Sequence, residues 1–310
     1  MSGIHHVTAI AGNAAQNLDF FTRILGLRFV KRTVNFDDPG TYHLYYGDEA
    51  GRPGSILTFF PWEHAAPGRS GVGLTQQTTF HIPARSVGYW THRLIEKGVN
   101  HEPFGTRFGQ SVLGFSDADG MGFALVGVEG AEAEPAWSDG DIPVEHAIRG
   151  FHGVTLLLSE AAPTAAILTD GLGFAEVGRD DGLIRFSAAE SLGGIVDIRE
   201  AGGFLAGRMG RGSVHHIAFR AADDAEQAAM AKRLVERQGM QVTEQKDRQY
   251  FRSIYFREPG GILFEIATDI PGFAVDEPVA TLGATLKLPA FLEPSRREIE
   301  AVLPPLERGA

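Results

Sequence analysis

The sequence contains no cysteine among its 310 residues. This absence excludes disulfides, iron–sulfur clusters, thiolate zinc sites and thiol nucleophiles, and it leaves histidine and carboxylate side chains as the strong metal ligands. A reducing compartment suits a chain without cysteine. We therefore expect a cytoplasmic protein.

Long apolar runs and an excess of basic residues are also absent. No run of about 18 apolar residues occurs, and the first residues lack the basic and apolar segments of an export signal. The 28 lysine and arginine residues are outnumbered by 39 aspartate and glutamate residues, which gives a formal net charge of −11. Because this charge repels phosphate groups, we expect neither nucleic acid nor a membrane as a partner.

The length and the glycine content indicate a two-domain protein rich in strands. A chain of 310 residues predicts two domains, and 39 glycines predict many tight turns between packed strands. Residues 129–148 are rich in Glu, Asp, Ala and Pro and are expected to form an exposed linker. We predict domains at 1–130 and 149–270, followed by a C-terminal tail at 271–310.

One pattern recurs four times along the chain: a short strand, a helix, a glycine and three further strands. The opening strands are expected at residues 3–10, 78–82, 151–156 and 214–219. A single βαβββ module leaves one face of its sheet uncovered, so modules must pair to enclose a space. The sequence therefore predicts an α+β fold in which four modules pair into two domains with cup-shaped mixed sheets. The C-terminal pair would carry most of a metal site.

Alignment of the four modules places candidate metal ligands in two columns. The opening strands contribute His6, His81, Gly153 and His216, and the last strands contribute Phe59, Leu125, Ile198 and Glu265. Only the fourth module has both a histidine and a carboxylate, and the first or second module could lend another histidine. Two imidazoles and one carboxylate form the facial triad with which non-haem Fe(II) oxygenases bind substrate and O₂.

These modules and columns resemble the vicinal oxygen chelate superfamily, which groups glyoxalase I, bleomycin-resistance proteins, fosfomycin-resistance enzymes and extradiol dioxygenases. The likeness covers nearly the whole chain. Four segments are similar to the ring-cleaving dioxygenases that open hydroquinones, namely 3–8, 59–62, 258–268 and 288–293. The resemblance implies a non-haem Fe(II) enzyme, with Mn(II) as an alternative metal, that cleaves hydroquinone-type or catechol-type diols with O₂. It implies His6, His216 and Glu265 as the metal ligands.

The same resemblance implies five further catalytic residues: His5, Thr8, His215, Arg248 and Tyr255. Arg248 would stabilise the anionic substrate, and Tyr255 would donate or accept a proton. Strand alternation puts Thr8 on the same face as His6, whereas His5 and His215 fall on the opposite face. A direct role for these two histidines therefore requires a twist or a bulge.

Two other functions compete with the dioxygenase. A glyoxalase-type lyase or isomerase usually needs a fourth protein ligand, and Phe59 stands where the first module would supply it. A non-catalytic protein that sequesters a small molecule would not need His6, His216 and Glu265 together. Modules two and three are interpreted as a structural half, and His43 is expected on the surface or in satisfied hydrogen bonds. The sequence leaves the ring substituents and the formation of a homo-oligomer open.

Overall fold

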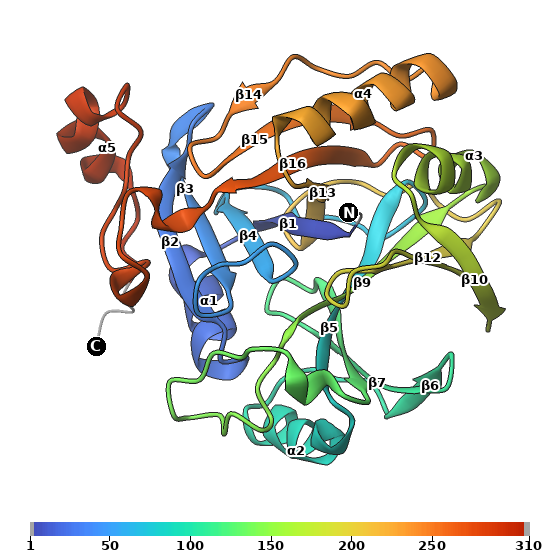
Figure 1. The fold of residues 1–310 in the computed structure, drawn as a ribbon. Helices are drawn as coiled ribbons and strands as arrows, with labels where there is room; N and C mark the ends of the chain where they lie inside the picture. Colours follow the sequence, from blue (N-terminus) through green and yellow to red (C-terminus); the bar gives the residue numbers. More distant parts are fainter. Residues whose placement is uncertain (1–2, 307–310) are drawn as a thin grey trace.

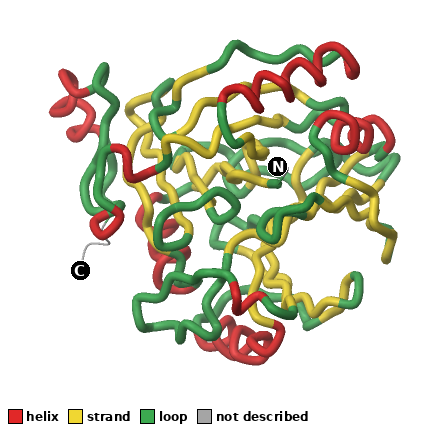
Figure 2. Tube along the Cα trace, in the orientation of Figure 1, coloured by secondary structure: helices red, strands yellow, loops and turns green. Residues whose placement is uncertain are grey.

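Two mixed sheets of eight strands each dominate the fold, and helices cover their outer faces (Figure 1). The computed structural model describes residues 3–306. Strands and loops greatly outweigh helices along the trace (Figure 2). The predicted α+β class with cup-shaped sheets is confirmed. None of the helices within residues 3–306 is long and apolar enough to cross a membrane.

The first sheet has the strand order β14-β15-β16-β13-β1-β4-β3-β2. In that order its strands span Lys246–Asp247, Phe251–Arg257, Leu263–Pro271, Ser213–Ala221, Ile4–Ala11, Ile56–Pro61, Asp38–Gly47 and Arg28–Asn35. The second sheet has the order β10-β11-β12-β9-β5-β8-β7-β6. Its strands span Ala175–Asp180, Leu183–Ser187, Ile195–Glu200, Gly150–Leu158, Leu74–Pro83, Gly122–Val128, Gln110–Ser116 and Gly105–Arg107.

Each sheet joins modules from different halves of the chain. Strand β1 of the first module pairs with β13 of the fourth, and β5 of the second pairs with β9 of the third, both antiparallel. The expected grouping was by consecutive modules, 1–130 and 149–270. Pairing through the opening strands gives each of them a neighbour on both sides, so no opening strand is left at a sheet edge. The strands that carry the histidines thus lie at the centre of the first sheet.

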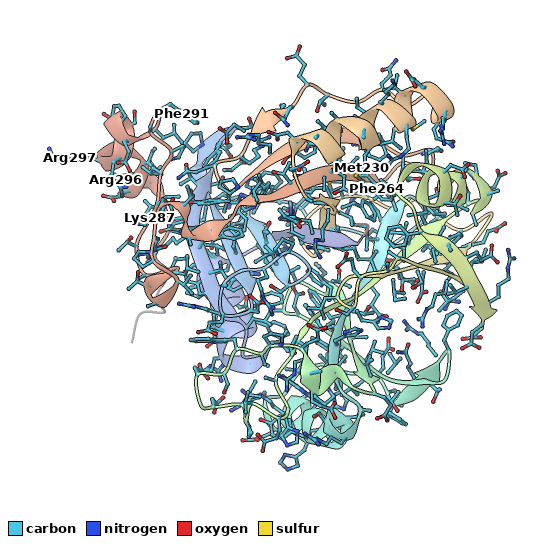
Figure 3. All side chains as sticks on the ribbon, viewed as in Figure 1. Met230, Phe264, Lys287, Phe291, Arg296 and Arg297 are labelled. Carbon is cyan, nitrogen blue, oxygen red and sulfur yellow. The ribbon has the colours of Figure 1, made fainter. Side chains whose placement is uncertain are left out.

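The helices are short and end where the sequence supplies stop signals. They span Ala14–Asp19 (α1), Val87–Glu96 (α2), Ala162–Ala166 (α3), Asp224–Gln238 (α4) and Arg296–Val302 (α5). The longest, α4, is capped at its start by Asp223, whose carboxylate accepts a hydrogen bond from the Glu226 amide, and at its end by Gly239, which has a left-handed φ of 65°. Its Met230 packs over Phe264 of β16 (Figure 3). This packing fixes the outer face of the strand that carries Glu265.

Side chains of β1 alternate between the core and the interior of the cup. Val7 and Ala9 are buried in the main apolar core, whereas His6 faces the opposite side and lines a cavity. The helices therefore cover one face of the first sheet, and the polar residues collect on the other.

The C-terminal tail packs against the edge of the first sheet. Leu288 and Ile299 form an apolar cluster with Val34 of β2, and Phe291 lies near Phe36 with ring centroids 6.1 Å apart (Figure 3). The tail therefore covers the edge of the sheet at β2, which would otherwise be exposed.

Candidate metal centre

Three adjacent strands bring the predicted ligands together on one face of the first sheet. His6 on β1 and Glu265 on β16 both lie opposite Ala218 of β13, and His216 lies two residues earlier on β13, opposite Thr8. Ligands placed on paired strands are held more rigidly than ligands on loops. The register of β1, β13 and β16 thus places all three side chains at one point.

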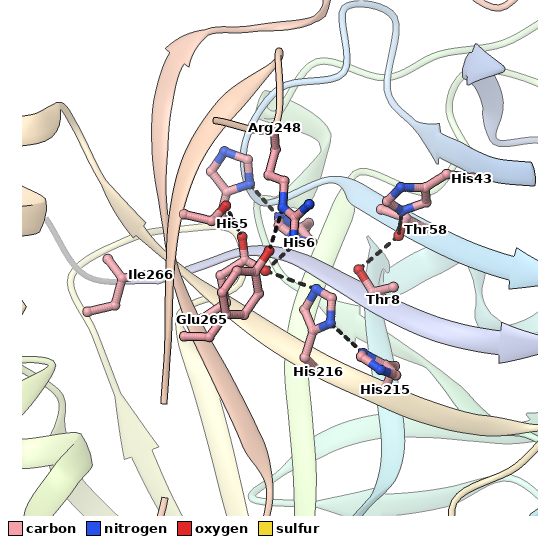
Figure 4. Close-up of polar contacts among 12 residues, drawn as sticks. His5, His6, Thr8, His43, Thr58, His215, His216, Arg248, Glu265 and Ile266 are labelled. Atoms are coloured by element: carbon pink, nitrogen blue, oxygen red, sulfur yellow. Dashed lines mark hydrogen bonds and ion pairs between the residues drawn. The ribbon is translucent and has the colours of Figure 1, made fainter. Parts of the chain in front are cut away.

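The three side chains converge closely (Figure 4). Glu265 Oε2 lies 2.9 Å from His216 Nε2 and 3.4 Å from His6 Nε2, and the candidate ligand atoms all lie within 4.8 Å of one another. Glu265 Oε1 accepts a hydrogen bond from Ser253, while the buried Oε2 has no partner with hydrogen-bond geometry. A buried carboxylate oxygen facing two imidazole nitrogens without a hydrogen bond fits a shared divalent cation.

The protonation states suit a cation as well. Burial alone would raise the pKa of Glu265, but the neighbouring imidazoles of His6 and His216 outweigh it and hold that pKa well below its usual value. Burial is the main cause that lowers the pKa of His216, despite the opposing effect of Glu265. The site therefore presents an ionised carboxylate and a neutral His216 imidazole, which are the forms that bind metal.

His5 and His215 both occupy bulges. The pairing of β1 with β13 skips His5 between Ile4 and His6, and it skips His215 between Val214 and His216. A bulge turns the extra residue away from strict alternation. His5 Nδ1 therefore lies 2.9 Å from His6 Nδ1, and His215 Nδ1 lies 2.8 Å from His216 Nδ1 (Figure 4). The bulge that a direct role requires is present at both positions.

A cavity of about 390 Å³ opens above the three side chains. Arg248, Tyr255 and His215 line it. Five aromatic side chains contribute to the remaining wall: Phe36, Tyr45, Phe60, Trp62 and Phe251. Arg248 Nε donates to the Tyr255 hydroxyl at 3.3 Å, and its Nη2 donates to Asp37 at 3.0 Å. Burial and the Glu265 charge raise the pKa of Tyr255, which keeps its hydroxyl protonated. The cavity suits a flat aromatic molecule that carries a negative charge.

Thr8 contacts the site only through other residues. Its hydroxyl accepts from Thr58 at 2.8 Å, and Thr58 in turn lies 2.8 Å from His43 Nε2. His43 Nδ1 lies 2.8 Å from the Tyr45 hydroxyl. His43 is thus in satisfied hydrogen bonds, as expected, but its position in the cavity wall was not predicted. Alternation along β3 places His43 and Tyr45 on one face, and this signal could have identified both.

The strand register corrects the predicted column of last-strand residues. His6 and His216 are equivalent positions of their modules. Two residues after His6, Thr8 lies opposite Thr58, and two residues after His216, Ala218 lies opposite Glu265. Thr58 therefore occupies the position that corresponds to Glu265, and the assignment of Phe59 to it was wrong by one residue. Phe59 packs in the core instead. The first module still supplies no carboxylate as a fourth ligand.

His81 provides a stability prediction from the second sheet. Burial lowers the pKa of His81 to about 4, whereas the pKa of a histidine in the unfolded chain is about 6.5. The neutral buried form therefore stabilises the fold above pH 6.5, and this stabilisation is lost as the pH falls towards 4. Between pH 7 and 4 we expect wild type to lose about 3 kcal/mol more unfolding free energy than His81→Gln. Urea titrations at the two pH values measure this difference.

A His92→Gln variant on the exposed face of α2 should retain the wild-type pH dependence of stability. Equal losses of unfolding free energy in wild type and His81→Gln would contradict the prediction.

Comparison with known proteins defines the class. The profile of the Glyoxalase/Bleomycin resistance protein/Dioxygenase superfamily matches residues 3–125 and 140–266. The chain belongs to this superfamily, as its modules indicated.

Individual relatives indicate which kind of superfamily member the chain resembles. The chain is 45% identical to "Putative ring-cleaving dioxygenase MhqO" of Bacillus subtilis (strain 168), over 98% of this chain and 96% of the relative. It is 34% identical to the chlorohydroquinone/hydroquinone 1,2-dioxygenase of Sphingobium indicum, over 96% and 95%. A solved structure described as a "putative dioxygenase" from Bacillus subtilis subsp. subtilis str. 168 matches with a TM-score of 0.94 and 44% identity, covering 98% of this chain and 97% of the other. These relatives support a dioxygenase.

Proposed function

We propose that the protein is an Fe(II)-dependent ring-cleaving dioxygenase that incorporates O₂ into hydroquinone-type dihydroxy-aromatics. The observation that carries the proposal is the convergence of two imidazoles and one carboxylate, within 4.8 Å of one another, beneath an aromatic-lined cavity. The relative named as a hydroquinone 1,2-dioxygenase supports this substrate class over catechol-type diols. We further propose Fe(II) rather than Mn(II) as the metal, and a cytoplasmic location.

His6, His216 and Glu265 would hold the metal, which when bound supplies a centre where the aromatic diol and O₂ meet. A ligating imidazole needs an Nε2 lone pair, so its Nδ1 must carry the proton. His5 and His215 present Nδ1 to these protons at 2.9 and 2.8 Å. They would accept the hydrogen bonds, fix the tautomers and orient both rings. Ser253 would hold the other oxygen of Glu265 in place.

Arg248 and Tyr255 would act on the substrate itself. The Arg248 guanidinium, steered by Asp37 and Tyr255, faces the cavity that contains the ligand cluster. It would stabilise the negative charge of the diol after a hydroxyl loses its proton. Tyr255, whose hydroxyl stays protonated because of burial, would donate a proton to an oxygen that becomes anionic during ring opening. Thr8 would support the cavity wall through Thr58.

The function is tested by oxygen uptake of protein reconstituted with Fe(II) under anaerobic conditions. We expect one O₂ consumed per hydroquinone, with loss of the aromatic ultraviolet absorbance, and slower turnover of catechol. Bound metal without oxygen uptake would favour a glyoxalase-type lyase or isomerase. Failure to bind metal would favour a sequestering protein, and either result would overturn the proposal.

Replacing Arg248 tests its role separately from the metal. An Arg248→Met variant should keep its metal and lose about 10- to 100-fold in kcat/KM for hydroquinone, because a hydrogen bond to a charged group contributes about 1.5–3 kcal/mol. Steady-state oxygen uptake measures the effect, with metal content determined on the same samples. Arg237→Met, on the exposed face of α4, is the matched control and should keep wild-type kinetics. Unchanged kcat/KM in Arg248→Met would exclude contact with the substrate.

A further inference from the structure

The second sheet contains a cup whose strands match those of the metal centre. Thr155 lies opposite Gln77 as Thr8 lies opposite His216, and Thr79 lies opposite Ala124 as Ala218 lies opposite Glu265. Gln77 and Ala124 therefore stand where the first sheet carries His216 and Glu265. Gly153, opposite Thr79, stands where the first sheet carries His6. The second cup thus lacks a ligand at each corresponding position.

A cavity of about 430 Å³, slightly larger than the one above the metal centre, lies beside these positions, and neither Gly153 nor Ala124 lines it. Gln77 and Thr155 line it, together with the guanidinium groups of Arg107 and Arg199. Apolar side chains complete one wall: Leu74, Phe115, Met121 and Val214. Because the positions that correspond to the metal centre carry neither histidine nor carboxylate, the lining of this cavity points to a different kind of ligand.

The two arginines bring positive charge that the surrounding residues leave unpaired. Arg107 Nη1 donates to Gln77 Oε1 at 2.7 Å, and Arg199 Nη1 donates to the carbonyl of Asp181 at 3.3 Å. Neither guanidinium has a carboxylate within 4.0 Å among residues 3–306. Burial lowers the pKa of Arg107 and the charge of Arg199 adds to this effect, although the charges of Asp197 and Glu102 oppose it. A bound anion would relieve this unfavourable charge.

The described acidic residues in and beside the cavity form no ion pair with either arginine. Asp197, whose charge acts most strongly on Arg107, is paired with Arg185 at 2.8 Å. Asp119 accepts a hydrogen bond from the Gly12 amide at 2.7 Å and lies 4.0 Å from Arg211 Nε. Glu102 lies exposed at the edge of the cavity. The interior therefore keeps a net positive charge at the two arginines.

Thr155 provides an independent sign of a missing ligand. Its side chain is only 4% exposed, and its hydroxyl has no hydrogen-bond partner among the described residues. The Thr75 hydroxyl, in the same cavity, is also buried and unpaired. Leaving a buried polar group unsatisfied is unfavourable. Two hydroxyls without a hydrogen-bond partner, beside two guanidinium groups without a carboxylate partner, form a set of donors that matches an oxyanion.

We propose that the second cup binds a small organic carboxylate, held by Arg107 and Arg199 and by the hydroxyl of Thr155. A planar carboxylate matches the fork of a guanidinium group, and the apolar wall suits a carbon skeleton better than inorganic phosphate. The positive centre that a metal would supply in the first cup is thus supplied by arginine side chains in the second. The site does not depend on the proposed dioxygenase activity.

Isothermal titration calorimetry of the full-length protein with benzoate, succinate and inorganic phosphate tests the proposal. We expect saturable binding of one carboxylate per chain in the millimolar range or below, tighter for benzoate or succinate than for phosphate. Arg107→Met and Arg199→Met should each weaken the carboxylate at least about 10-fold, and Thr155→Val should weaken it to a smaller extent. Arg237→Met should bind as wild type does. Thermal unfolding of each variant confirms that it is folded.

The outcomes separate this site from the metal centre. Glu265→Gln should bind the carboxylate as wild type does, whatever its oxygen uptake, because Glu265 belongs to the other sheet. No saturable binding, wild-type affinity in both Arg107→Met and Arg199→Met, or a preference for phosphate would each overturn the proposal. Loss of carboxylate binding in Glu265→Gln would place the ligand in the first cup and would overturn it too.

Discussion

A Glu265→Gln variant is expected to lose iron and, with it, all oxygen uptake with hydroquinone. The carboxylate lies between the two imidazoles, at 2.9 Å from His216 Nε2 and 3.4 Å from His6 Nε2, and it is the only acidic member of the cluster. Glutamine keeps the shape but removes the negative charge that offsets a divalent cation. Loss of a residue that merely supports a ligand weakens metal binding about 10- to 100-fold, so we expect loss of a ligand to weaken it by more than about 100-fold.

The measurements are the Fe(II) affinity, determined under anaerobic conditions, and the oxygen uptake of protein that has been loaded with Fe(II) anaerobically. Glu244→Gln makes the same charge change at an exposed position before β15 and should leave both quantities at wild-type values. Wild-type iron binding by Glu265→Gln would remove Glu265 from the metal site. Unfolding of the variant would be visible in its circular dichroism spectrum, and His6→Gln and His216→Gln then provide the same test on the other two strands.

A Lys31→Met variant should lose about 3–5 kcal/mol of unfolding free energy, the range found when one partner of a buried ion pair is removed. The Lys31 side chain is fully buried, and its ammonium lies 2.7 Å from Asp276 and 2.9 Å from Glu277. Methionine fills similar space but leaves two carboxylates without a counter-charge, and Glu277 is itself buried.

The same substitution should also reduce activity, because Asp276 is a shared anchor. Its carboxylate accepts hydrogen bonds from Gln249 at 2.7 Å and from Tyr250 at 3.0 Å, directly after Arg248. Chemical denaturation measures the stability and oxygen uptake measures the activity. Lys232→Met, whose side chain is 70% exposed, should change stability by less than about 0.5 kcal/mol. A stability change of less than about 0.5 kcal/mol in Lys31→Met would show that the ion pairs of Lys31 with Asp276 and Glu277 are not needed for stability.

Periodic features of the sequence predicted the fold and the ligand cluster. The recurrence of a strand, a helix and three strands identified the modules, because each module must bury one face of its sheet against a helix. The pairs His5-His6 and His215-His216 recur at equivalent positions, and Glu265 falls in register with them. Such regularities are local in the chain and are therefore visible without a structure.

Features that depend on contacts between distant strands were less accessible. The pairing of β1 with β13 joins the first and fourth modules, and only this pairing creates the bulges at His5 and His215. The one-residue error at Phe59 has a different cause, because the β1–β4 and β13–β16 pairings are regular. The chain from Thr8 to Thr58 is three residues longer than the chain from Ala218 to Glu265, so the last strands cannot be aligned by counting from the opening strands. The position of His43 in the cavity wall was not predicted, because it depends on which face of β3 turns towards the cup. Bulges and module pairing are tertiary properties, so a single sequence specifies them only weakly.

Isotope labelling tests the central claim of a ring-cleaving dioxygenase most directly. Protein loaded with Fe(II) would convert hydroquinone under ¹⁸O₂, and mass spectrometry would count the labelled oxygen atoms in the product, after correction for exchange of any aldehyde oxygen with water. We predict a ring-opened product that carries both atoms of one O₂ molecule. An intact ring, or a ring-opened product with one labelled atom or none, would contradict the proposed function.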